Sequence, residues 1–146
     1  MPISHVSLAT GASMWKAMRS FYLDALTPLN YVVYYEKENE MLGLRPQNGE
    51  PDFWLHVGNG EQPAYENGDV KNRPGRAHIA FDVESREVVD KFFTAATKAG
   101  GAPNGDPGLR PYADGYYAAF VLDPLGNNIE AIHFKPKKQN LHSTSD

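Results

Sequence analysis

The sequence has no cysteine among its 146 residues, which excludes disulfide bonds, a thiolate nucleophile and any metal site with sulfur ligands. It also lacks a long apolar run, so no membrane span is expected. Its 14 basic residues do not outnumber its 18 acidic residues, and nucleic acid is therefore not expected as a partner. The first residues lack the basic and then apolar pattern of a secretion signal, which favours a cytoplasmic protein.

Two catalytic signatures are also missing. The glycine pairs at Gly58-Asn59-Gly60 and Gly100-Gly101 do not stand between a predicted strand and a predicted helix, so they do not indicate a phosphate-binding loop or a nucleotide cofactor. No Gly-x-Ser-x-Gly segment occurs, and serine-based nucleophilic catalysis is not supported.

The 41% hydrophobic content and 12% aromatic content indicate a folded globular chain. In the first part, an alternating pattern predicts a strand over residues 3–8, and apolar residues at helical spacing predict a helix between Met14 and Ala25. Three more strands are predicted over 31–35, 41–44 and 52–57. The first part therefore has the order β-α-β-β-β.

The second part repeats this order. A strand is predicted over 77–83, a helix over 88–99, a short strand over 102–104, a loop over 105–114, and strands over 116–122 and 127–134. Such a repeat predicts two copies of one unit that share a core. We expect a single domain over 1–135, with module one at 1–58, a Gly-, Asn- and Pro-containing connection at 59–75 and module two at 76–135, followed by a polar tail at 136–146.

Four side chains in the first and last strands of the two modules are candidate metal ligands: His5, His56, His78 and Glu130. His5 and His78 are 73 residues apart, and His56 and Glu130 are 74 residues apart, so each pair has similar places in the two copies. Because side chains alternate faces along a strand, all four are predicted to point away from the helix-packed face. Imidazole and carboxylate donors without thiolates suit a divalent Zn, Ni, Mn, Co or Fe(II) ion.

Four further residues are candidate ligand contacts. Trp54 has the same parity as His56, and Arg110 lies in a Gly- and Pro-rich loop where its guanidinium could hold a carboxylate or phosphonate. Tyr116 and Tyr117 are neighbours in one predicted strand, so only one of them can face the cavity. Each of the four also has a purely structural interpretation, as core or surface packing.

The chain resembles the vicinal oxygen chelate superfamily, also called the glyoxalase/bleomycin-resistance/dioxygenase fold. The resemblance runs from His5 to Phe134 and rests on His5-Val6-Ser7-Leu8, Phe21-Tyr22-Leu23-Asp24-Ala25-Leu26, His78-Ile79-Ala80-Phe81, Gly100-Gly101 and the run from Tyr116 to Glu130. It implies an α+β fold in which two βαβββ modules form a curled mixed sheet around a cavity. The segment from Gly105 to Tyr112 resembles a glyoxalase-like branch of largely unassigned role.

The resemblance implies a divalent metal held by His5, His78 and Glu130, with His56 as a fourth ligand or a catalytic proton shuttle. Glyoxalase I enzymes have a glutamate where this chain has His56. The expected activity is that of a metal-dependent lyase, isomerase or transferase acting on a small oxygen-chelating molecule. Two alternatives stay open: a non-catalytic binding protein like the bleomycin-resistance proteins, and an extradiol-type dioxygenase. The cavity can close within one chain or be shared across a homodimer.

Overall fold

The computed structural model describes residues 3–58 and 77–135; the predicted connection at 59–75 and the predicted tail at 136–146 lie outside these ranges. Module one contains β1 (Val6–Thr10), α1 (Trp15–Ala25), β2 (Tyr31–Lys37), β3 (Met41–Pro46) and β4 (Phe53–Val57). Two short 3-10 helices, Ala12–Met14 and Thr27–Leu29, flank α1. Module two contains β5 (His78–Asp82), α2 (Arg86–Lys98), β6 (Ala102–Leu109), β7 (Tyr117–Leu122) and β8 (Asn128–His133).

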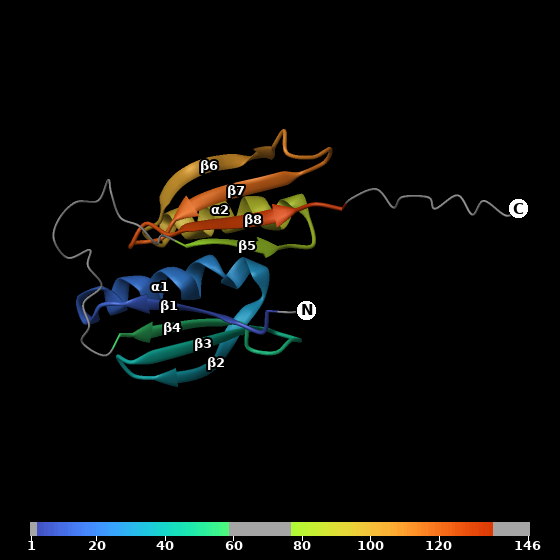
Figure 1. Ribbon diagram of the computed structural model, residues 1–146. Helices are drawn as coiled ribbons and strands as arrows, with labels where there is room; N and C mark the ends of the chain where they lie inside the picture. Colours follow the sequence, from blue (N-terminus) through green and yellow to red (C-terminus); the bar gives the residue numbers. More distant parts are fainter. Residues whose placement is uncertain (1–2, 59–76, 136–146) are drawn as a thin grey trace, which may run out of the picture.

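Each module forms its own four-stranded mixed sheet, in the order β1-β4-β3-β2 and β5-β8-β7-β6. Figure 1 shows the two sheets curled but not closed, with the first below the second. The first and last strands of each module pair in parallel, and the remaining pairs are antiparallel. The predicted α+β class and the two βαβββ modules are confirmed, and the mixed sheet consists of two separate halves.

The helices form because each carries one apolar stripe. In α1 the buried residues recur at helical spacing, at Trp15, Met18, Phe21, Tyr22 and Ala25. In α2 the Ser85 side chain accepts a hydrogen bond from the Val88 backbone N–H and begins the helix, and Gly100, with φ of +101°, follows its end.

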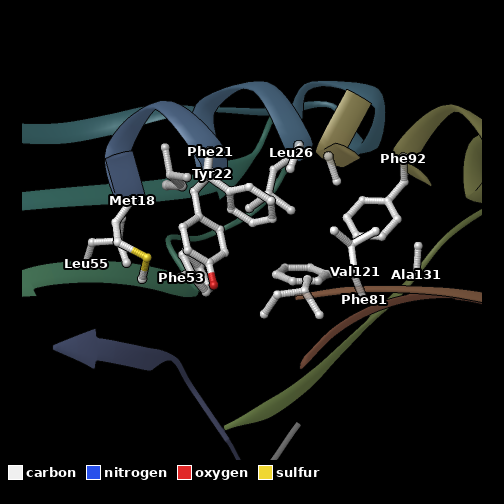
Figure 2. Packing of buried hydrophobic residues seen from close by; sticks show 14 of the residues in the cluster. Met18, Phe21, Tyr22, Leu26, Phe53, Leu55, Phe81, Phe92, Val121 and Ala131 are labelled. Carbon is white, nitrogen blue, oxygen red and sulfur yellow. The ribbon is translucent and has the colours of Figure 1, made fainter. Parts of the chain in front are cut away.

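One hydrophobic cluster joins the two modules. Figure 2 shows Tyr22 of α1 against Phe53 of β4, with Phe21 beside Tyr22 and Phe81 of β5 nearby. The Phe53 and Phe81 ring centroids lie 5.9 Å apart. The helices and this cluster occupy one side of the sheets. The candidate metal-ligating side chains belong to the opposite face.

Strand β6 is longer than the sequence analysis predicts. The predicted strand over 102–104 is confirmed but too short, and the predicted loop over 105–114 is wrong for residues 105–109, because β6 continues to Leu109. Pro103 and Pro107 are tolerated there because β6 is an edge strand that pairs only with β7. Its register with β7 shifts around Gly105, as at β-bulges. The first strand also begins later than predicted, at Val6.

No helix in the described part of the chain combines the length and the apolar character needed to cross a membrane.

Candidate functional site

The carboxylate of Glu130 is the centre of the candidate site. Glu130 lies in the middle of β8 and is only 3% exposed. His78 Nε2, on the neighbouring strand β5, lies 2.8 Å from its Oε2, and the Tyr116 hydroxyl donates to its Oε1 at 2.6 Å. A buried carboxylate needs such partners to offset the loss of water.

The strand register explains why these groups meet. Ala80 of β5 is the direct partner of Glu130 in the parallel pair, and His78 is the partner of Asn128. His78, Ala80, Asn128 and Glu130 therefore share one face by alternation, while Ile79, Phe81, Ile129 and Ala131 turn toward the hydrophobic cluster. The predicted face of His78 and Glu130 agrees with this placement.

Hydrogen bonds continue from His78 along the wall of the site. The Asn104 amide donates to Asn128 Oδ1 at 3.2 Å, and Asn128 Nδ2 lies 3.5 Å from His78 Nδ1. A cavity of about 350 Å³ opens beside this wall, and its lining also includes Arg110, Tyr112 and Phe120. Sequence reasoning missed Asn104, Tyr112, Phe120 and Asn128. Asn128 has the parity of Glu130, which is a signal that could have identified it.

Tyr116 and Tyr117 point to opposite faces. Tyr116 contacts Glu130, whereas the Tyr117 hydroxyl donates to Asp90 of α2 at 2.7 Å and its ring lies under the Arg86 guanidinium. Tyr116 is therefore the tyrosine at the candidate site. Tyr117 lies on the helix side.

Partial desolvation, followed by the hydrogen bond to Glu130 and the carboxylate's charge, raises the pKa of Tyr116 to about 12. Because the folded-state pKa exceeds the usual value of about 10, the contribution of this group to stability is complete below pH ~10 and is lost as the pH rises through about 12. We expect an ultraviolet difference titration of the wild type against Tyr116→Phe to show a tyrosine with a midpoint near 12. In a Glu130→Gln background this midpoint will fall. An unchanged midpoint there would contradict the role of the carboxylate.

Module one places its candidate residues differently. His5 precedes β1, is exposed, and its Nδ1 lies 2.8 Å from the hydroxyl of its neighbour Ser4. His56 Nδ1 lies 2.7 Å from Ser7 Oγ. The structure therefore brings together Ser7 and His56, and it does not pair His5 with His56.

The two sheets differ in register with respect to the sequence repeat. Ser7 pairs with Trp54 and Ala9 with His56, whereas Ala80 pairs with Glu130. If His5 is equated with His78, Trp54 and not His56 stands at the position of Glu130. If His56 is equated with Glu130, Ser7 takes the position of His78. The sequence analysis equated His5 with His78 and His56 with Glu130. The strand registers allow one of these two equivalences, but not both at once.

Trp54 lies on the open face of the first sheet. Its ring is 6.1 Å from that of Tyr34 and 6.2 Å from that of Tyr35. It also covers Gly43, where an added Cβ would come within 2.5 Å of the indole. Tyr34 and Tyr35 are largely exposed, so this aromatic group is open to solvent in the single chain.

His78 and Glu130 have the spacing of two ligands of one divalent metal ion. Neighbouring ligands about 2.0–2.2 Å from a shared ion lie roughly 3 Å apart, so His78 Nε2 and Glu130 Oε2, at 2.8 Å, fit as two adjacent ligands. Within residues 3–58 and 77–135 there is no group of three or more potential ligands close enough to hold an ion. The described part of one copy of the chain thus supplies a pair of donors that fits a divalent metal.

Comparisons with known proteins identify the family. Residues 4–131 match the family model described as Glyoxalase/Bleomycin resistance protein/Dioxygenase superfamily. The chain belongs to this superfamily. The resemblance expected from the sequence is confirmed.

Solved structures support the same fold. A glyoxalase/bleomycin resistance protein from Albidiferax ferrireducens T118 is 25% identical, with a TM-score of 0.70 over 92% of this chain and 100% of that chain. A glyoxalase-related enzyme from Fulvimarina pelagi is 20% identical, with a TM-score of 0.66 over 90% and 87% of the two chains. A lactoylglutathione lyase from Agrobacterium tumefaciens is 19% identical, with a TM-score of 0.59 over 91% and 96%. A search of curated proteins gives no match.

Proposed function

We propose that this glyoxalase-superfamily protein is a metal-dependent lyase, isomerase or transferase that acts on a small molecule with neighbouring oxygen atoms. The observation that carries the proposal is the buried Glu130 carboxylate, which is held between the Tyr116 hydroxyl and the imidazole of His78, a residue that lines a cavity. A buried acid beside an imidazole and an open cavity is an arrangement typical of a reaction centre.

His78 and Glu130 would hold the divalent metal, and Tyr116 would fix the carboxylate through its second oxygen. When bound, a divalent metal polarises substrate oxygens and lowers the pKa of a bound water. The hydrogen bond of Tyr116 to Oε1 leaves Oε2 as the oxygen that faces His78. The protein's own contribution is therefore to orient one oxygen and one nitrogen donor before any ligand arrives.

The remaining ligands would come from module one of a second copy, in a homodimer. His56 is the better candidate, because the Ser7–His56 contact occupies the same diagonal of the strand pair as His78–Glu130. Its Nδ1 is held by Ser7, and Nε2 has no hydrogen bond to any described residue. His56 would act as a further ligand or as a proton shuttle, and His5 remains a second candidate.

The test is metal content together with complementation. Protein purified without an affinity metal, dialysed against Zn, Ni, Mn, Co or Fe(II) and analysed by mass spectrometry should carry close to one ion per chain; less than about a tenth of an equivalent would overturn the proposal. Equal amounts of Glu130→Gln and His56→Gln copies refolded together should regain about a quarter of the metal, because roughly half of the dimers are then heterodimers and each heterodimer has one intact site of two. A mixture that binds no more metal than its parents would overturn the shared site.

A second candidate function is non-catalytic binding of a flat molecule, as in bleomycin-resistance proteins. The exposed aromatic group of Tyr34, Tyr35 and Trp54 favours it, since flat ligands stack on such rings. Ligand binding that survives both Glu130→Gln and chelator treatment, without turnover, would select this function.

A further inference from the structure

The cavity beside His78 holds one positively charged side chain, Arg110. Its guanidinium lies over the Phe120 ring, 5.3 Å from the centroid, and one Nη2 hydrogen is donated to the Asp106 backbone carbonyl. Within the described ranges, Arg110 forms no ion pair with an aspartate or glutamate. The guanidinium is thus oriented by a ring and a carbonyl while its other N–H groups are left for a ligand.

The backbone is shaped around this guanidinium. A Cβ added at Gly105 would come within 2.8 Å of the Phe120 ring and 3.2 Å of Arg110 Nη2. This glycine lies where β6 shifts its register against β7, and an irregular strand position of this kind commonly re-aims a neighbouring side chain. The room for Arg110 therefore depends on the absence of a side chain at Gly105.

Two contacts tie Arg110 to the carboxylate centre. Phe120 is a neighbour of both, because its ring is 5.3 Å from the Arg110 guanidinium and 6.1 Å from the His78 ring. The Arg110 backbone N–H also donates to the carbonyl of Tyr116, whose hydroxyl contacts Glu130. The distance between the guanidinium and the His78–Glu130 pair is thus set by a strand and a ring, and it is short enough for one small molecule to span.

We propose that Arg110 is an anion subsite that binds the carboxylate of a small organic acid and directs the rest of the molecule toward His78 and Glu130. The planar fork of a guanidinium matches a carboxylate through two parallel hydrogen bonds. A dianionic phosphonate fits less well, because the described lining has one cation and also includes Asp106. This inference rests on the proposed function for the direction of the substrate, but the subsite itself needs no metal.

The test uses 2-hydroxybenzoate as the probe, with 2-hydroxybenzamide as its neutral counterpart of the same shape. Binding to chelator-treated protein is measured by nuclear magnetic resonance, following backbone shifts at residues 104–120. We expect the benzoate to bind at least tenfold more tightly than the benzamide, and Arg110→Gln to remove this difference. Arg110→Lys keeps the positive charge but lacks the planar guanidinium. It should therefore retain only part of the difference in affinity between the benzoate and the benzamide.

Arg86→Gln is the matched control, because Arg86 also stacks on an aromatic ring of β7 but on the helix side. It should leave benzoate binding unchanged. Equal affinity for the two probes, an unaffected Arg110→Gln variant, or tighter binding of phenylphosphonate than of the benzoate would overturn the carboxylate subsite. Because the chelator removes metal, failure of the metal proposal would leave this result intact, and failure of the subsite would leave metal binding intact.

Discussion

Replacing Glu130 by glutamine will weaken binding of a divalent metal by roughly a hundredfold or more. Loss of an outer-shell partner of a metal ligand already costs ten- to a hundredfold in affinity, and Glu130 is proposed as a direct ligand. The substitution keeps the size of the side chain but removes its charge, so the fold should persist. Isothermal titration with the metal that the native protein retains is the measurement, with circular dichroism as the check on folding.

Two further variants serve as comparisons for the effect of Glu130→Gln on metal affinity. Tyr116→Phe removes the hydroxyl that donates to Glu130 Oε1, and it should weaken metal binding by about ten- to a hundredfold, less than loss of the carboxylate itself. Glu87→Gln makes the same charge change on α2, where Glu87 is exposed and pairs with Lys91, and should have no effect. Equal metal affinity in wild type and Glu130→Gln would remove the proposed metal centre.

The placement of His78 and Glu130 could be predicted because it follows from local rules. Both lie in strands whose neighbours are apolar at every second position, so alternation alone assigns their face. Their meeting also needs β5 and β8 to be adjacent and in parallel register. The superfamily resemblance implied that first-strand and last-strand residues meet, and in both halves the first and last strands do lie next to each other.

The register of module one could not be predicted in the same way. A shift of two residues keeps every side chain on its own face, so the alternation of Phe53, Trp54, Leu55 and His56 is equally consistent with either register. The structure aligns Ser7 with Trp54, and this choice separates His5 from His56. Only the pairing itself, which depends on packing between the strands and the helix, distinguishes the two cases.

The cavity residues around Arg110 were missed for a related reason. Prolines and glycines between Ala102 and Arg110 are typical of a loop, and the edge position that lets β6 carry them is a property of the whole sheet. With only 102–104 predicted as a strand, the pairing of residues 105–109 with β7 is absent, and the side chains around Arg110 cannot be placed beside His78. Arg110 itself was identified, because it lies in a Gly- and Pro-rich segment where a guanidinium could hold an anion.

Asp123→Ala will lower the free energy of unfolding by about 3–5 kcal/mol, because it leaves several buried hydrogen-bond donors without their acceptor, at about 1–3 kcal/mol for each donor left unsatisfied. Asp123 is 4% exposed. Its Oδ1 accepts the backbone N–H groups of Leu125 and Asn127, and its Oδ2 accepts Asn127 Nδ2 and the Tyr22 hydroxyl at 2.6 Å. Burial, followed by the charge of Asp123 and this hydrogen bond, raises the pKa of Tyr22. Urea unfolding is the measurement, and the midpoint should fall with little change in slope.

The effect should be large because this carboxylate holds two parts of the molecule at once. It closes the turn that leads into β8, the strand of Glu130, and it also joins that turn to α1 in module one. Tyr22→Phe removes one of four partners and should cost about 1–2 kcal/mol. Asp90→Ala breaks a comparable bond to Tyr117 at an exposed position and should cost under about 1 kcal/mol. If Asp123→Ala cost no more than Asp90→Ala, the turn would not be what fixes β8 against module one, and the position of Glu130 would depend on strand pairing alone.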